Sequence, residues 1–129
     1  MLNTIQSWLQ GYIDKSWVGQ VNLFICDGIP GNCTLRPLQT KLQSHSCGLT
    51  GFTRWDYRSL YHLTYLSTNQ SNWMEELATW CQEENAMGDQ PFRGYLETIA
   101  CKRLPNGTYE YTAILAVDYQ LTAGGETDV

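Results

Sequence analysis

Cysteine and histidine are the residue types in this chain best suited to chemistry, and their spacing favours a packing role. The five cysteines are Cys26, Cys33, Cys47, Cys81 and Cys101. His45 stands two residues before Cys47, and together with Cys26 and Cys33 this pair comes nearest to a zinc-binding set. Structural zinc sites normally use two closely spaced ligand pairs, which this set lacks. We therefore expect small buried or half-exposed cysteines, and no metal or cofactor.

A cysteine activated by a histidine and a carboxylate would be a nucleophilic catalyst. The histidines are His45 and His62, and no recognisable motif surrounds either. His62 falls in the middle of an expected strand, where a packing or pairing role is more common. We predict that the chain is not an enzyme. The alternative is a small α+β enzyme or ligand-binding domain. It requires a deep pocket with a perturbed Cys or His, and loss of activity when His62 or Cys101 is replaced.

Acidic and glycine-rich stretches give no catalytic signature. Four glutamates form two adjacent pairs in an expected helix: Glu75, Glu76, Glu83 and Glu84. Such side chains are typical of a solvated helix face rather than of paired catalytic carboxylates. The stretches 28–31 and 48–51 lack the glycine spacing of a phosphate-binding loop, so we interpret them as turns.

Aromatic side chains recur along one expected strand, at Trp55, Tyr57, Tyr61 and Tyr65. This row would suit a stacking platform for single-stranded nucleic acid. Only Arg54 and Arg58 flank it, however, and the formal net charge of the chain is −5, which disfavours a nucleic-acid-binding face. Packing in the core and between subunits is the better interpretation.

Length and composition fit a single domain over residues 1–129. This length is usual for one domain, and a hydrophobic content of 43% suffices for a core. Residues 1–12 lack the features of a secretion signal, and no stretch is apolar enough to span a bilayer. The odd cysteine count fits a reduced cytoplasmic compartment. We therefore interpret the Asn-x-Ser/Thr triplets at Asn32, Asn69 and Asn106 as chance.

Helical periodicity predicts two helices. In residues 2–14, Leu2, Ile5 and Leu9 recur at helical spacing, while Gln6 and Gln10 lie on the opposite face. Residues 71–87 form the second helix, with an apolar face at Trp73, Leu77, Trp80 and Cys81. Asn72 is its expected N-cap and Glu75 its capping-box partner.

Alternating patterns predict the strands. Three are clear, over residues 53–67, 95–103 and 108–121, and Pro105-Asn106-Gly107 signals a hairpin between the last two. A shorter strand over 20–26 places Val21, Leu23 and Ile25 on one side. Residues 32–38 and 41–46 are weaker, separate pieces, and Pro37 limits the first of them to an edge. Residues 122–129 are expected to form a flexible tail.

This order of elements predicts an α+β fold. We expect a mostly antiparallel or mixed sheet of about four strands, with two helices packed on one face. The second helix would serve as a crossover if the strands at 53–67 and 95–103 are parallel.

Several segments together resemble the tail-terminator-like, or minor capsid, proteins of long-tailed phages and prophages. They are Ile5-Gln6-Ser7-Trp8-Leu9, then Pro30-Gly31-Asn32-Cys33-Thr34-Leu35-Arg36-Pro37-Leu38, then Asn72-Trp73-Met74-Glu75-Glu76-Leu77-Ala78-Thr79-Trp80, and the tyrosine-rich closing strand at 109–119. The resemblance covers nearly the whole chain in element order. Residues 41–51 depart from the family's pattern.

The resemblance implies a structural protein of the virion, assembled in the cytoplasm of the host bacterium. Such proteins form a ring, commonly a hexamer, that caps the tail tube and joins it to the head. The implied partners are further copies of the chain, the tail tube protein and a head–tail neck protein, with no membrane. DNA would only pass through the lumen, which an acidic charge suits. The alternative within the virion is another head–tail connector, neck or tail-completion protein.

A ring requires a heterologous interface, in which two different patches are complementary. We expect subunit or tail contacts at Arg36, Arg54 and Arg58, on the exposed edges of the 53–67 and 108–121 strands, and in the 27–38 loop. Charge reversal at Arg54 or Arg58 is expected to weaken ring assembly or tail docking while leaving the fold intact.

Overall fold

The computed structural model describes residues 2–16, 19–48, 51, 53–83 and 93–123. It contains two helices and five strands in an α+β arrangement, which confirms the predicted fold class. In chain order the elements are α1 (Leu2–Ser16), β1 (Val21–Leu23), β2 (Cys33–Cys47), β3 (Thr53–Ser67), α2 (Trp73–Glu83), β4 (Arg93–Arg103) and β5 (Tyr109–Ala123).

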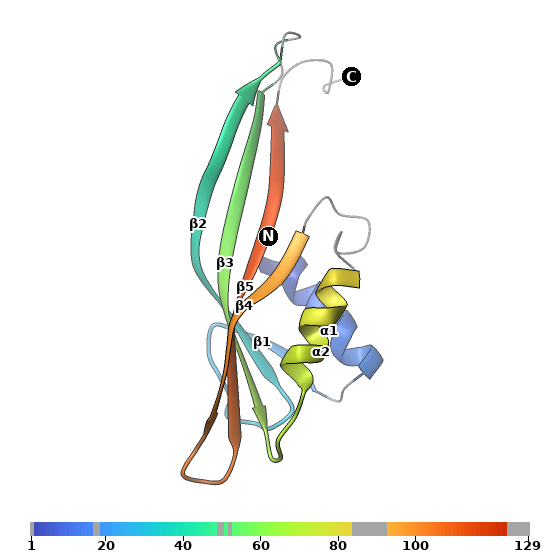
Figure 1. The fold of residues 1–129 in the computed structure, drawn as a ribbon, viewed down its shortest axis with the longest axis vertical. Helices are drawn as coiled ribbons and strands as arrows, with labels where there is room; N and C mark the ends of the chain where they lie inside the picture. Colours follow the sequence, from blue (N-terminus) through green and yellow to red (C-terminus); the bar gives the residue numbers. More distant parts are fainter. Residues whose placement is uncertain (1, 17–18, 49–50, 52, 84–92, 124–129) are drawn as a thin grey trace.

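The sheet is mixed and has the strand order β1-β2-β3-β5-β4. β1 is parallel to β2, and every other neighbouring pair is antiparallel. The sheet therefore has five strands where about four were expected. Both helices lie on the same side of it, as predicted (Figure 1).

β2 is one continuous strand, so the prediction of two separate pieces was wrong. The register with β3 shifts between Pro37 and Gln39 and again between Leu42 and Ser44. Each shift is a bulge, which lets β2 stay paired with β3 although its sequence does not alternate regularly. β1 covers β2 only at residues 33–35, so Pro37 faces an open edge where its missing N–H breaks no ladder. Its predicted edge position is confirmed.

β1 is shorter than expected and ends at Leu23. Phe24 adopts a φ of 70°, a left-handed conformation that turns the chain out of the strand. Ile25 is consequently 79% exposed, whereas Val21 is buried. The prediction that Val21 and Ile25 share one side of a strand was therefore wrong.

β4 contains a bulge that changes the phase of its side chains. The register shifts between Glu97 and Ala100, and Thr98 has a φ of 54°. Leu96 pairs with Leu115 and Cys101 with Tyr111, so these two β4 residues share the helix-facing side. The strict alternation predicted for residues 95–103 fails beyond Glu97 for this reason.

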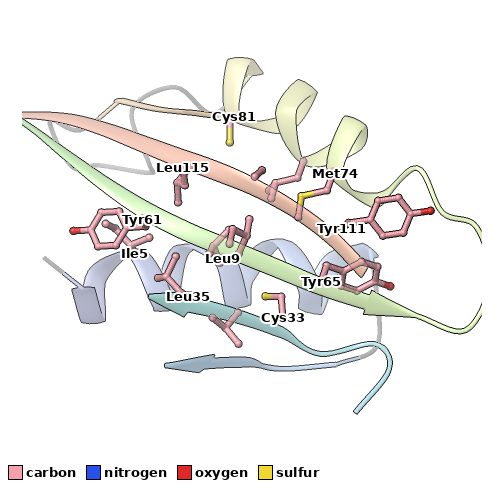
Figure 2. Close-up of a cluster of buried hydrophobic side chains, with 14 of the residues drawn as sticks. Ile5, Leu9, Cys33, Leu35, Tyr61, Tyr65, Met74, Cys81, Tyr111 and Leu115 are labelled. Atoms are coloured by element: carbon pink, nitrogen blue, oxygen red, sulfur yellow. The ribbon is translucent and has the colours of Figure 1, made fainter. Parts of the chain in front are cut away.

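The core lies between the sheet and the two helices (Figure 2). Its largest fully buried side chains include Ile5 and Leu9 of α1, Leu35 and Leu63 of the sheet, and Trp73 and Leu77 of α2. One aromatic stack joins the sheet to α2, with the Tyr65 and Trp73 rings 4.3 Å apart, and another joins α1 to α2, with the Trp8 and Trp80 rings 4.9 Å apart. The predicted apolar faces of both helices are confirmed where the structure describes them.

α2 begins at Trp73, two residues after the predicted start and directly after the expected N-cap Asn72, but its first turn is capped differently. The Asn72 carbonyl accepts the first helical bond from the amide of Glu76 at 2.9 Å. The Asn72 side chain donates to the Glu76 carboxylate at 3.1 Å, and the Ser71 hydroxyl accepts from the amide of Trp73. Asn72 therefore engages Glu76 rather than the expected Glu75. Residues 84–87, the expected end of this helix, lie outside the described residues.

β5 lies between β3 and β4 and is antiparallel to both, so β3 and β4 run parallel to each other. α2 is therefore the expected crossover, and it passes over the position of β5. The predicted hairpin is present, since Gly107 has a φ of 86° and Leu104 bonds to Thr108. β5 extends through Ala123, two residues into the predicted tail, and residues 124–129 lie outside the described residues.

Candidate interaction surface

Three strands extend past the helices as an arm (Figure 1). We define the arm as residues 38–47 of β2, 53–58 of β3 and 118–123 of β5. β3 and β5 run through both core and arm without a break in register, from Ser67 and Tyr109 to Thr53 and Ala123. The arm is therefore a direct extension of the core sheet.

The helix-facing side of the arm is apolar. Its side chains, here called the apolar arm face, form two cross-strand rows: Leu42, Tyr57 and Tyr119, then His45, Trp55 and Leu121. The Tyr57 and Tyr119 rings stack at 5.5 Å, and the His45 and Trp55 rings lie 5.7 Å apart. Leu42 and Leu121 are about half exposed, at 53% and 51%. The side of the sheet that forms the core thus continues beyond the two described helices.

The opposite side of the arm is charged. Arg54 forms an ion pair with Asp56 at 3.2 Å, and Asp56 also accepts from the Ser44 hydroxyl. Arg58 donates to both carboxylate oxygens of Asp118, at 2.7 and 3.1 Å. The arm therefore has one polar and one apolar side, the usual pattern of a sheet that covers something on one side only.

The three arginines predicted to make contacts have different environments in the structure. Arg58 is committed within the subunit, because it binds Asp118 and lies 5.2 Å from the Tyr95 ring centroid. This interaction with the Asp118 carboxylate raises the pKa of Arg58. Arg54 forms an ion pair with Asp56. Arg36 is exposed on β2 and forms no ion pair with any described residue. Charge reversal at Arg58 would thus disturb the β3–β5 pair itself.

The predicted contact edges are present only in part. β3 has no exposed edge, because β2 and β5 flank it along its length. β5 is flanked by β4 only up to Asp118, so its residues 119–123 have an edge that no described strand covers. The other open edges are the outer edges of β1 and β4, and that of β2 beyond residue 35. The predicted loop contact at 27–38 is divided, because residues 33–38 belong to β2.

A second apolar surface lies in the loop between β1 and β2. Phe24, Ile25 and Ile29 project from it with 56%, 79% and 54% of their surfaces exposed, and we call this trio the loop tip. The loop is held at both ends, since the amide of Phe24 donates to Leu35 at 3.0 Å and that of Gly31 to Leu66 at 2.8 Å. Three large apolar side chains on a fixed loop are typical of a docking site.

Asp27 organises this loop from within. Its carboxylate accepts bonds from the amide of Ile29 at 3.0 Å and from the side chains of Asn22 and Asn32 at 2.8 and 3.0 Å. These bonds, led by the one from Ile29, lower the pKa of Asp27. The loop tip is therefore presented by a network of polar groups that favours one conformation.

We predict that the Asp27 carboxyl titrates below its usual pKa of 3.8. The folded-state pKa is depressed, so the carboxylate stabilises the loop above the unfolded pKa, and this contribution is lost as the pH falls through the folded value. A carboxyl-carbon NMR titration measures the midpoint. The amide of Ile29 should shift with the same midpoint, and Asp27→Asn should remove that shift. A midpoint at or above 3.8 would contradict the network.

The cysteines do not gather into one site. Cys33 and Cys47 stand at the two ends of β2, and no group of three His, Cys, Asp or Glu among the described residues is placed to hold a metal. Cys33 and Cys81 are buried in the core, and burial raises the pKa of each thiol to about 12. Cys26, Cys47 and Cys101 are exposed.

We predict that three of the five thiols react with a thiol reagent at pH 8 in the native protein. Cys26, Cys47 and Cys101 are accessible, whereas Cys33 and Cys81 are both shielded and protonated. Mass spectrometry of the labelled chain counts the sites, and all five should react in denaturant. Rapid native labelling of Cys33 or Cys81 would contradict the described core.

The enzyme alternative required a pocket with a perturbed Cys or His. An open cleft of about 760 Å³ lies at the start of α2, and its lining includes Glu75, Cys101 and Tyr111. The Tyr111 hydroxyl accepts from the amide of Ser71 at 2.7 Å. His62 pairs with Ile114 on the other face of the sheet, so the sheet separates it from Cys101. The structure does not bring these two candidates together.

No protein-family model and no curated protein sequence matches this chain. Neither described helix is long and apolar enough to cross a membrane. The aromatic row expected from sequence divides between two places: Tyr61 and Tyr65 are in the core, whereas Trp55 and Tyr57 lie on the arm. Of the loop tip, the predicted contact loop at 27–38 included Ile29 but missed Phe24 and Ile25. Their signal was the pair Phe24-Ile25 directly before the 27–31 turn.

Proposed function

We propose that this protein is a structural, non-enzymatic subunit of a phage or prophage virion. It would form a ring, commonly a hexamer in the family it resembles, that caps the tail tube and joins it to the head. The observation that carries the proposal is the apolar arm face. It continues the core side of the sheet beyond the helices and leaves Leu42 and Leu121 half exposed.

Two further observations support assembly. The chain has a second, separate apolar surface at the loop tip, and a closed ring needs two different patches on each subunit. The α+β arrangement is compatible with the α/β sandwich that the resemblance implies. The tail tube protein and a head–tail neck protein are the proposed partners, and DNA would pass only through the lumen.

Light scattering coupled to size exclusion, over a concentration series and with negative-stain imaging of the peak, tests the proposal. We expect ring-shaped particles of several subunits, either from the free protein or after addition of the tail tube protein. Immunogold labelling of virions should then place the protein at the head–tail joint. A chain that remains monomeric in both conditions would overturn the proposal.

The neighbouring function, a connector or neck protein, differs in the partner that is bound. Pull-down with isolated tails and with isolated heads separates the two. A tail terminator binds tails that have no head, whereas a connector binds the head vertex first.

A further inference from the structure

We infer that the loop tip of one subunit docks on the apolar arm face of a second copy of this chain. The contact would be the heterologous interface of the proposed ring, and it presupposes that ring. Phe24, Ile25 and Ile29 of one copy would contact the two cross-strand rows of the apolar arm face of the other copy. Within those rows Leu42 and Leu121 are more than half exposed.

The two surfaces cannot meet within one chain. The loop directly precedes the first residue of β2, and the arm lies at the far end of the same strand (Figure 1). From Cys33 to Leu42 an extended strand spans about 30 Å. The two patches can therefore contact each other only between two molecules, and the pair of patches is directional.

Direct pairing of open strand edges is the competing way to join copies, and the structure disfavours it. β2 has Pro37 and two bulges along its open edge, and β4 has a bulge beside Thr98. The edge of β5 that no described strand covers is short, only residues 119–123. Proline, bulges and short edges are among the devices by which proteins prevent edge-to-edge pairing. Contacts between side-chain surfaces are therefore favoured over an extended ladder.

Charge favours loop-on-arm contact over contact between two loop tips. Asp27 is the single charged residue between Gly19 and Leu35, and its lowered pKa keeps it anionic. The arm holds three cations, Lys41, Arg54 and Arg58, against two carboxylates, whereas the whole chain has a net charge of −5. All five of these arm charges lie on the side opposite the apolar arm face, so they act on a docked loop only at longer range, where the net charges of loop and arm are opposite. Two loop tips, in contrast, would place two Asp27 carboxylates together.

Four single substitutions on exposed positions test the contact. Ile25→Asp and Ile29→Asp place a carboxylate in the loop tip, and Leu42→Asp and Leu121→Asp place one on the apolar arm face. Each is expected to raise the concentration needed for assembly by at least about tenfold, because a buried charge at an interface centre is strongly unfavourable. Ile99→Asp is the matched control: Ile99 is 40% exposed but lies on neither surface, so assembly should not change.

Mixing the variants tests the direction of the contact. Ile25→Asp retains an intact arm, and Leu121→Asp retains an intact loop, so an equimolar mixture has one usable interface. We expect monomers from each variant alone and a 1:1 dimer, with nothing larger, from the mixture. Assembly lost in only one of the two variants would indicate contact between like patches and would overturn the inference.

Cross-linking through natural thiols provides a test that requires no folding of an aspartate variant. Cys26 adjoins Ile25 in the loop, and Cys47 lies at the end of the arm; both are exposed. A short bismaleimide should link Cys26 of one copy to Cys47 of another in the assembled protein. Cys101→Ser should leave this product unchanged. Links confined to Cys26–Cys26 or Cys47–Cys47 would contradict the contact.

The outcomes separate this contact from the ring itself. Rings of normal size from Ile25→Asp and Leu121→Asp would overturn the loop-on-arm contact while leaving the proposed ring standing. A wild-type chain that remains monomeric at every concentration, with and without the tail tube protein, and gives no Cys26–Cys47 product would overturn both.

Discussion

Replacing Trp73 with alanine is expected to lower the free energy of unfolding by about 3–5 kcal/mol, the usual cost of deleting a buried tryptophan. Trp73 is fully buried, and its ring stacks on Tyr65 at 4.3 Å, so the change opens a cavity where α2 meets the sheet. Small domains are commonly stable by about 5–15 kcal/mol, so a large part of the total would be lost. Urea denaturation followed by circular dichroism measures the effect.

Trp55→Ala is the matched control. Like Trp73, Trp55 lies on the helix-facing side of the sheet. It belongs to the arm, however, where it is partly exposed and packs beside His45. Its removal should change the free energy of unfolding by less than about 1.5 kcal/mol, because a partly buried side chain removes less apolar surface from water than a fully buried one. It should instead weaken association. Equal destabilisation by the two substitutions would mean that the arm is part of the core.

Gly19→Ala is expected to destabilise the protein by more than about 2 kcal/mol. Gly19 has a φ of 151°, and a side chain there would collide with the backbone carbonyl of Gly31. The close approach fixes the start of β1 against the end of the loop. Thermal and urea unfolding of the variant check the prediction.

Gly11→Ala should act in the opposite direction. Gly11 lies inside α1, and a Cβ there meets nothing within 4 Å, so only the helix propensity changes. We expect stabilisation by about 1 kcal/mol. If Gly19→Ala were neutral, or Gly11→Ala destabilising, the described backbone around β1 or along α1 would be wrong.

Strands with strict alternation were predictable from sequence. β3 has its predicted bounds, and β5 covers the predicted 108–121 strand except for its first residue. The buried residues Tyr111, Leu115 and Val117 lie on one face of β5. These segments alternate β-forming and polar residues with a period of two, so local pattern and tertiary burial agree. The helix faces were predictable for the same reason, with a period of 3.6.

β2 was only partly predictable, because its strand character comes from its neighbour. Residues 39–46 are mainly polar and carry no alternating pattern, yet they pair with β3 almost to its end. The bulges in β2 and β4 shift the phase of the side chains without a distinct local signal. The extent of β2 and the phase of its side chains therefore depend on pairing with a distant strand, which local sequence patterns do not reveal.

The sequence predicted that aromatic side chains form a contact surface, but it did not predict which of them do so. Sequence indicated that the aromatic row packs in the core and between subunits, but the structure alone divides that row between core and arm. Phe24 turns the chain and exposes Ile25, which the pattern had placed beside Val21. Gln10 was expected to face solvent, yet its side chain accepts from the amide of Val21 at 3.0 Å and secures β1.

The position of β5 has a consequence for how the chain reaches this fold. β5 lies between β3 and β4, although it follows both in sequence, and it pairs residues as distant as Thr53 and Ala123. During synthesis β3 has β2 on one side and an unpaired edge on the other until the last strand emerges. Closing such long loops costs entropy before any ladder forms, which slows folding. We therefore expect a slow, cooperative final step in which β5 inserts and completes core and arm together.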